Sequence, residues 1–559
     1  MKKIIGILTI VLLSACKEKK NSMEDEVVLW RPYNDSIEVA ANADHEIERM
    51  QYKLIQSKVL DKNEVFLPLY DEVSKFSEEK YHALAPMILE QNIFAIRDFI
   101  EQGALSYEEL VLFYLHRIYK YELNNNTTLN TVIALNAKVV EQARALDQDL
   151  KMNRAPKIQH PIYGMPILLK DNINTTGMKT TAGSLALINN EAEDAFIVSN
   201  LKKNGALILG KVNLSEWAYF LCSGCPVGYS AYGGQTLNPY GRRIFETGGS
   251  SSGSGTSIAA NYAVAAVGTE TSGSILSPSS QNSVVGLKPT IGLLSRTGIV
   301  PISSTLDTPG PMTKNVVDNA ILLSAMLGHD AQDPASVEKE FPGILSAGLH
   351  PVEISEMRLG AFTELMKTDS IYRNTVEDLE KAGAQIVKFT PPDVNMDGFL
   401  SILNIDMRND LPKYLKEFGV PANVKVGSVQ EVINFNKQDS TVRIPYGQSL
   451  FEGIIADTTT KEKLLEIKAN LEKNGRLFFD SALDTHGLDA ILSINNYHAG
   501  YAAVAKYPAL TVPMGYKETG EPISLTFIGK QFSEANLLRM GKAFENKFKA
   551  RVMPKGYGE

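Results

Sequence analysis

The chain has 559 residues, of which 44 % are hydrophobic and 21 % are charged, a composition typical of a globular protein that buries a large core. Its formal net charge is -8 and its sequence pI is about 5.7. Binding to a nucleic-acid backbone requires a basic surface, so this acidic balance argues against nucleic acid as the main partner.

The first segment has the pattern of an export signal. Lys2 and Lys3 precede a short apolar stretch over residues 4–13, and Leu-Ser-Ala then leads to Cys16. About 20 apolar residues are needed to cross a bilayer, so this stretch predicts a signal peptide rather than a membrane-spanning helix. A cysteine after small residues resembles a bacterial lipobox. The alternative is an ordinary signal peptide followed by an incidental cysteine.

This pattern predicts where the protein is located. Residues 1–15 are expected to form a lipoprotein signal peptide, with lipid attached to Cys16 after cleavage. Residues 16–34 are expected to form a tether. The mature protein would then be a lipoprotein of the bacterial cell envelope, periplasmic or anchored to the outer membrane, which contacts the membrane through its N-terminal lipid only.

The other two cysteines, Cys222 and Cys225, have the spacing Cys-x-x-Cys. A zinc site needs four ligands, and no further cysteine or histidine lies close in sequence. The intervening Ser-Gly and the following Pro226 indicate a loop. In an oxidising compartment a small local disulfide is favoured over redox catalysis.

Helical patterns dominate the chain after the tether. Residues 35–87 have apolar side chains at helical spacing among Glu and Lys, which predicts a helical extension. Residues 93–121 predict one or two amphipathic helices with a break near Gly103. Ser106 and Glu109 have the spacing of a capping box at the start of the second helix.

The middle of the chain alternates between strand and helix patterns. Short apolar runs at residues 167–169 and 206–209 predict buried strands, and residues 195–204 predict a helix between them. Strand patterns return at 490–494, 510–513 and 523–528. This alternation predicts a single large α/β domain over residues 88–559, with a central twisted mixed β-sheet covered by helices on both faces.

Residues 331–486 differ from the rest of this domain. They are irregular and charged, with one clear helix over residues 461–479. We expect them to form a variable, lid-like region outside the sheet.

Three segments contain the residues best suited to catalysis. Lys170 ends an apolar strand, Ser250 lies in the Gly/Ser-rich loop 248–255, and Ser274 lies in the sequence Gly-Thr-Glu-Thr-Ser-Gly-Ser at 268–274. Taken singly, each pattern is weak, because a lysine ending an apolar run is usually a surface residue and a Gly/Ser loop is usually a connector. Residues 249–253 also match Gly-x-Ser-x-Gly, which would require a later histidine such as His498.

Together the three segments resemble the amidase signature family. The two key serines are 24 positions apart, the spacing of the family's motif. The resemblance runs from about residue 88 to the end of the sequence, and the Glu and triple serine look most like bacterial peptide amidases, which remove C-terminal amides from peptides. Further matching segments are 210–217, 233–239, 286–289, 307–312 and 508–513.

The resemblance implies the amidase signature fold and a Ser-Ser-Lys triad. Ser274 would be the nucleophile, Lys170 the base, and Ser250 a bridging serine preceded by a cis peptide bond from Gly249. Lysine can act as a base only when it is neutral, and lowering its pKa from about 10.4 to near 7 disfavours the charged form by about 4.6 kcal/mol. Burial at the end of an apolar strand can supply this by desolvation.

The resemblance also implies an oxyanion hole. The backbone N–H groups of Thr271, Ser272, Gly273 and Ser274 would stabilise the negative charge that develops on the substrate carbonyl oxygen.

The motif departs from the family at three positions. Glu270, Ser272 and Leu276 stand where Asp, Gly and Arg are common, and peptide amidases share the Glu. Ser272 places a side chain beside the nucleophile. These changes affect specificity rather than the triad.

The expected activity is hydrolysis of carboxylic or peptide amides through an acyl-enzyme. The substrate would be a small amide or an amidated peptide, with no metal or organic cofactor. A transamidation subunit that makes amidated transfer RNA is a second reading, which the export signal argues against. A third is a non-catalytic envelope lipoprotein that uses the fold as a binding surface, which retention of all three polar residues argues against.

Overall fold

The computed structural model describes residues 27–156, 159–419 and 422–558. The predicted signal peptide, Cys16 and the first part of the tether lie outside these residues. Among the described residues, no helix is both long enough and apolar enough to cross a bilayer.

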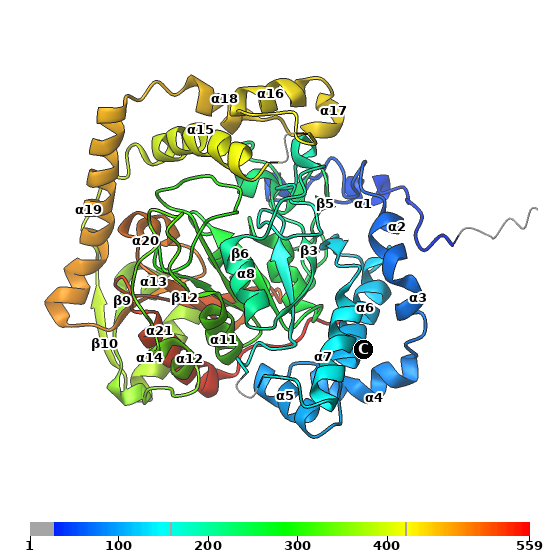
Figure 1. The fold of residues 1–559 in the computed structure, drawn as a ribbon. Helices are drawn as coiled ribbons and strands as arrows, with labels where there is room; N and C mark the ends of the chain where they lie inside the picture. Colours follow the sequence, from blue (N-terminus) through cyan, green and yellow to red (C-terminus); the bar gives the residue numbers. More distant parts are fainter. Residues whose placement is uncertain (1–26, 157–158, 420–421, 559) are drawn as a thin grey trace, which may run out of the picture.

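A mixed β-sheet occupies the centre of the molecule (Figure 1). Its eleven strands lie in the order β1-β3-β2-β6-β8-β7-β12-β13-β11-β9-β10. This confirms the predicted α/β fold. The strands are β1 (Val132–Leu135), β2 (Pro166–Lys170), β3 (Leu207–Val212), β6 (Ala265–Glu270), β7 (Val285–Lys288), β8 (Thr308–Thr313), β9 (Arg358–Phe362), β10 (Gln385–Phe389), β11 (Ala490–Ile494), β12 (Ala509–Tyr516) and β13 (Pro522–Ile528). A separate pair consists of β4 (Tyr229–Ser230) and β5 (Gly234–Gln235).

Strand direction divides the sheet into parallel and antiparallel parts. Strand β2 is parallel to β3 and β6, and β9 is parallel to β10 and β11. Between β6 and β11 in the sheet order, each pair of adjacent strands is antiparallel. Every residue of β2, β3 and β6 is buried, because helices cover this part of the sheet and leave no solvated face.

Two groups of helices pack against these strands. One group, linked through α11, consists of α8 (Phe196–Lys203), α11 (Val316–Met326), α12 (Gly343–Ala347) and α21 (Glu534–Phe548). The other consists of α9 (Ser252–Ala259) and α10 (Leu276–Gln281), which contact each other and the central strands. Around β9, β10 and β11 lie α13 (Thr363–Thr368), α14 (Ser370–Lys381), α19 (Lys461–His486) and α20 (Ala499–Ala505).

The first helices of the chain form one side of the molecule (Figure 1). The capping box is confirmed, because Ser106 Oγ accepts the N–H of Glu109 at 3.1 Å and the Glu109 carboxylate accepts the N–H of Ser106 at 2.9 Å. The break at Gly103 is also confirmed. These helices are α1 (Ser36–Ala40), α2 (Lys62–Phe66), α3 (Tyr70–Val73), α4 (Glu78–Ile88), α5 (Ile93–Glu101), α6 (Tyr107–Glu122) and α7 (Val139–Lys151).

The predicted helical extension differs from the structure over residues 41–61. This stretch consists mainly of turns, with one short 3-10 turn at Glu48–Met50. The Asp35 carboxylate accepts the N–H groups of Ile55 at 2.8 Å and Gln56 at 3.0 Å. A side chain therefore satisfies backbone donors that a helix would otherwise pair.

Arg117 on α6 connects distant parts of the chain. Its side chain is completely buried, and its guanidinium donates to the backbone oxygens of Ala260 at 2.9 Å, Asn261 at 3.1 Å and Tyr557 at 2.6 Å. The C-terminal end of the chain accordingly lies beside α6 (Figure 1).

The predicted lid-like region, residues 331–486, contributes both a layer of helices and part of the sheet. Its helical layer lies at one edge of the molecule in Figure 1 and has its own apolar cluster, which includes Ile402 and Phe451 and extends to Trp217. The helices of the layer are α15 (Phe399–Glu417), α16 (Val429–Lys437), α17 (Ser440–Arg443) and α18 (Ser449–Ala456).

The expectation that this region lies outside the sheet is wrong for β9 and β10. Both strands belong to the eleven-stranded sheet. Strand β10 is the edge strand and is mostly accessible to solvent, so its sequence lacks the continuous apolar run of a buried strand. The helix predicted over residues 461–479 is confirmed and extends to His486, where Gly487 ends it in the left-handed conformation.

Candidate active site

Lys170 lies at the carboxyl end of β2 and is completely buried. Its Nζ donates to Ser250 Oγ at 2.8 Å, to Thr269 Oγ1 at 2.8 Å and to the backbone oxygen of Thr269 at 3.1 Å. Since β2 and β6 are parallel neighbours, the ends of both strands bring Lys170 and Thr269 to the same edge of the sheet. Asn172 Nδ2 also donates to Thr269 Oγ1, at 2.9 Å.

The surroundings of Lys170 favour its neutral form. Burial lowers the pKa of Lys170 from 10.5 to about 7, although the negative charges of Asp307 and Glu270 act in the opposite direction. An amine with this pKa is substantially unprotonated at neutral pH, so it can accept a proton.

The three consecutive serines that begin with Ser250 make three different contacts. Ser250 Oγ accepts from Lys170. Ser251 Oγ donates to the backbone oxygen of Thr269 at 3.0 Å and accepts the N–H of the same residue at 3.1 Å. Ser252 Oγ donates to the backbone oxygen of Gly248 at 2.7 Å. The serines therefore join the Gly/Ser loop to β6 and to itself.

The backbone of this loop is closely packed. The peptide bond between Gly249 and Ser250 is cis, as the resemblance implies. The N–H of Ser215 donates to the backbone oxygen of Ser250 at 3.1 Å. A Cβ atom on Gly253 would lie 2.4 Å from the backbone oxygen of Asn213, so a larger residue there would displace one of the two segments.

Ser274 lies in the turn between β6 and α10, and the buried carboxylate of Glu270 holds this turn in place. The carboxylate accepts the N–H groups of Gly273 at 2.6 Å, Ile275 at 2.7 Å and Leu276 at 3.0 Å. Three charge-assisted hydrogen bonds fix the backbone on both sides of Ser274. Glu270 is thus a positioning residue for Ser274.

The structure ties Ser274 to the serine loop through its backbone. The N–H of Ser251 donates to the backbone oxygen of Ser274 at 3.1 Å. Across the described residues, the Ser274 hydroxyl has no hydrogen-bond partner, and 8 % of the residue is accessible to solvent. The contact between Lys170 and Ser250 is therefore observed, whereas proton transfer between the Ser250 and Ser274 hydroxyls stays a prediction.

The expected set of oxyanion donors is corrected at Gly273. Its N–H is directed to the Glu270 carboxylate, so it is not available to a substrate oxygen. The N–H groups of Thr271, Ser272 and Ser274 have no acceptor among the residues that the structure describes.

Asp307 connects the Ser274 turn to a cavity. Thr271 Oγ1 donates to its carboxylate at 2.6 Å, as do the N–H groups of Ile302 and Ser303, both at 2.8 Å. Burial nevertheless raises the pKa of Asp307 to about 6.

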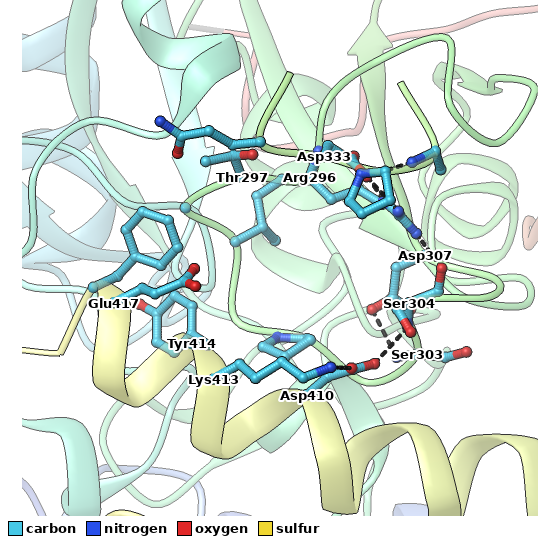
Figure 2. Close-up of a pocket in the computed structure, with 17 residues that line it drawn as sticks. Arg296, Thr297, Ser303, Ser304, Asp307, Asp333, Asp410, Lys413, Tyr414 and Glu417 are labelled. Atoms are coloured by element: carbon cyan, nitrogen blue, oxygen red, sulfur yellow. Dashed lines mark hydrogen bonds and ion pairs between the residues drawn. The ribbon is translucent and has the colours of Figure 1, made fainter. Parts of the chain in front are cut away.

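The cavity has a volume of about 560 Å³ and lies between α15 and the loops that contain Arg296 and Asp333 (Figure 2). The Arg296 guanidinium forms an ion pair with Asp333, and Asp410, Tyr414 and Glu417 of α15 line the opposite side. Lys170, Ser250 and Ser274 are not among its lining residues. Asp307 also lines a smaller cavity with Asn172, Thr269 and Thr271. The two cavities share Arg296, Ile299 and Asp307 in their linings.

The alternative catalytic histidine is not supported. His498 Nδ1 lies 2.6 Å from Ser493 Oγ, and its ring stacks on Phe362 with 4.0 Å between ring centroids. Burial lowers the pKa of His498 to about 4. In the described part of the chain it makes no hydrogen bond to Ser251.

The loop that contains the two remaining cysteines contacts α18 of the helical layer. Cys222 and Cys225 form a disulfide. The backbone oxygen of Leu221 accepts the N–H of Leu450 at 3.2 Å, and the N–H of Ser223 donates to Ser449 Oγ at 3.0 Å. No group of three or more His, Cys, Asp or Glu side chains in the described ranges is arranged to hold a metal ion.

The roles of Thr269, Glu270 and Asp307 in holding the site do not follow from the sequence pattern. All three lie inside the segments that resemble the amidase signature family, and this resemblance was the one sequence feature that pointed to them. Their contacts cross between loops, so spacing along the chain could not reveal them.

Comparisons with known proteins agree with this fold. A model of the family described as Amidase matches residues 109–493. A probable amidase of Arabidopsis thaliana is 36 % identical over 488 residues, covering 84 % of this chain and 92 % of that protein. One component of the glutamyl-tRNA(Gln) amidotransferase of Caldanaerobacter subterraneus is 31 % identical, covering 83 % of this chain and 97 % of that protein.

Two solved structures extend the likeness to three dimensions. An amidase family protein from Bacillus anthracis is 38 % identical with a TM-score of 0.83, covering 90 % of this chain and all of that chain. The peptide amidase of Stenotrophomonas maltophilia is 34 % identical with a TM-score of 0.77, covering 83 % and 98 % of the two chains.

These findings define an enzyme class: a large α/β hydrolase that acts on the carbon–nitrogen bonds of amides. The chain belongs to the amidase family, that of the amidase signature enzymes.

The role of Glu270 can be tested by Glu270→Gln. The carboxamide keeps the shape of the side chain, but its NH₂ group faces N–H donors and its negative charge is lost. We expect kcat for amide hydrolysis to fall by roughly 100-fold, because small displacements of a nucleophile cost about that much. The matched control is Glu534→Gln, a buried carboxylate that accepts the N–H of Thr290. Wild-type kcat in Glu270→Gln would contradict the role.

Proposed function

We propose that this enzyme is a serine hydrolase that cleaves carboxylic or peptide amides through an acyl-enzyme, with Ser274 as nucleophile, Ser250 as proton relay and Lys170 as base. The observation that carries the proposal is the completely buried Lys170 amine, 2.8 Å from Ser250 Oγ and with a pKa near 7.

The three contacts of Lys170 suit a neutral amine. Such an amine has two N–H donors and one lone pair. When the amine is neutral, its two oxygen neighbours on Thr269 can accept both N–H groups. The hydrogen bond between Lys170 and Ser250 then reverses, and the amine lone pair accepts the Ser250 hydroxyl proton. The amine then functions as a proton acceptor for Ser250 rather than as a fixed charge.

Acylation would proceed by proton transfer along this chain of groups. Ser274 Oγ forms a bond to the substrate carbonyl carbon as its proton passes to Ser250 Oγ, while the Ser250 proton passes to Lys170 Nζ. The free N–H groups of Thr271, Ser272 and Ser274 stabilise the oxyanion, and one such donor is typically worth about 2.7–4 kcal/mol.

Breakdown of the intermediate would reverse the proton flow. The carbon–nitrogen bond breaks as Ser250 gives a proton to the leaving nitrogen and regains one from Lys170. Ammonia or an amine leaves, and Ser274 carries the acyl group as an ester. Water then attacks the ester with the same relay, releasing a carboxylic acid and restoring the Ser274 hydroxyl.

Two other functions are less well supported. A component of a transfer-RNA amidotransferase is among the proteins this chain resembles, but the predicted export signal argues against a role in making amidated transfer RNA. A non-catalytic binding protein would have no need for a buried lysine with a lowered pKa beside a serine. Buried charges are costly and are usually retained for a purpose.

The proposed location is the bacterial cell envelope, with attachment through lipid on Cys16. The support for it is the N-terminal sequence pattern alone, and it stays a prediction.

The nucleophile can be tested by covalent labelling. A serine-reactive fluorophosphonate should label the wild-type protein at Ser274 and abolish amide hydrolysis, and Ser274→Ala should be neither labelled nor active. The control is Ser277→Ala, three residues further along the chain on α10. Full hydrolysis of a peptide amide by Ser274→Ala would refute the proposed nucleophile.

The base can be tested through its pH dependence. The pKa of Lys170 is lowered, so the neutral amine predominates above about pH 7. We expect kcat/KM to rise with pH to a plateau, with a midpoint near 7, and Lys170→Ala to fold but lose amide hydrolysis. Because the charge of Asp307 raises the pKa of Lys170, Asp307→Asn should move the midpoint to lower pH. Near-normal turnover by Lys170→Ala would exclude lysine as the base.

The relay can be tested by comparing leaving groups. Ser250→Ala should slow hydrolysis of an amide more than hydrolysis of the corresponding ester, because an alkoxide leaves with less need of a proton than an amine does. The measurement is kcat for a matched pair of substrates with the same acyl group. Equal losses on both would contradict a relay role for Ser250.

A further inference from the structure

The turn between β11 and α20 is held rigidly from both sides. At its start, Asn495 has a positive φ of 46°. Its N–H donates to the backbone oxygen of Ser524 at 3.0 Å, its Oδ1 accepts the N–H of Ser524 at 2.8 Å, and its backbone oxygen accepts from Thr526 Oγ1. At its end, His498 is fixed by Ser493 and Phe362. The two residues between, Asn496 and Tyr497, therefore have a fixed backbone.

This turn lies directly against the residues that precede Ser274. A Cβ atom on Gly273 would lie 3.0 Å from Asn496 Nδ2 and 3.6 Å from the Cβ of Ala499. A Cβ atom on Gly500 would lie 3.8 Å from Ser272 Oγ. The turn and the start of α20 thus form one wall beside the proposed oxyanion donors.

Asn496 brings an unused pair of hydrogen-bonding groups to this wall. Its side chain is exposed, and within the described ranges its carboxamide has no hydrogen-bond partner. The adjacent Tyr497 is 59 % exposed. A carboxamide offers a donor and an acceptor side by side, which is the complement of another amide group.

We propose that Asn496 binds a second amide group of the substrate, the peptide bond on the acyl side of the amide that is cleaved. This inference about Asn496 rests on the proposed function, because the proposed nucleophile places the scissile carbonyl at the Ser274 turn. Asn496 Nδ2 donates to the peptide oxygen and Oδ1 accepts the peptide N–H, while the Tyr497 ring covers the neighbouring part of the chain. The residue selects amidated peptides over simple amides that lack a second amide group.

The selectivity can be measured with two substrates. N-acetyl-alanyl-alanine amide contains the second amide group and propionamide does not. For Asn496→Ala we expect kcat/KM for the peptide amide to fall by about 10-fold to 100-fold, mainly through KM, with propionamide little changed, because a lost pair of hydrogen bonds weakens binding by about that much. Asn496→Asp retains an acceptor, so its kcat/KM for the peptide amide should lie between those of the wild type and Asn496→Ala.

A matched control is Asn434→Ala, an exposed asparagine on α16 whose side chain contacts Gln430. It should leave both substrates unchanged. Equal losses on both substrates in Asn496→Ala, or no loss on the peptide amide, would overturn the proposal.

A binding measurement separates this inference from the catalytic mechanism. In the Ser274→Ala background, adding Asn496→Ala should raise the Kd of N-acetyl-alanyl-alanine amide by about 10-fold or more in calorimetry. An unchanged Kd would refute the role of Asn496 even if Ser274 is the nucleophile. Conversely, a raised Kd together with persistent hydrolysis by Ser274→Ala would contradict only the proposed nucleophile.

Discussion

The site depends on a buried amine. Lys170 has no solvent contact, and its three hydrogen bonds go to Ser250 and Thr269. Burial lowers the pKa of Lys170, while the charges of Asp307 and Glu270 limit how far it falls. The same two carboxylates hold the backbone around Ser274, Glu270 through three N–H groups and Asp307 through Thr271. Electrostatics and backbone geometry are therefore set by the same side chains.

Much of the fold could be predicted from sequence because its central strands are buried on both faces. Residues 167–169 and 206–209 are uninterrupted apolar runs, and both lie within or at the start of strands. The prediction failed where that signal is absent. Strand β10 is at the edge of the sheet, and residues 41–61 are held by the Asp35 side chain instead of a helical ladder.

In the site, too, features contained in a short sequence motif could be predicted, whereas contacts between side chains and backbone groups could not. The pairing of Lys170 with Ser250 and the cis bond at Gly249 were implied by the family resemblance, and the structure contains both the contact and the cis bond. The resemblance implied four consecutive oxyanion donors, yet the N–H of Gly273 donates to the Glu270 carboxylate and so does not belong to that set. The Glu270 carboxylate accepts N–H groups of the turn that follows it, and this contact decides which N–H groups remain free. A linear motif does not contain that information.

The contact between Arg117 and Tyr557 affects how the chain can fold during synthesis. The two residues are 440 positions apart, and the buried guanidinium donates to the backbone oxygen of Tyr557. Until the ribosome has added Tyr557, the Arg117 guanidinium on α6 lacks one of its native hydrogen-bond acceptors. Burying it early would be unfavourable. The native packing around Arg117 can therefore be completed only after the last residues of the chain have been made.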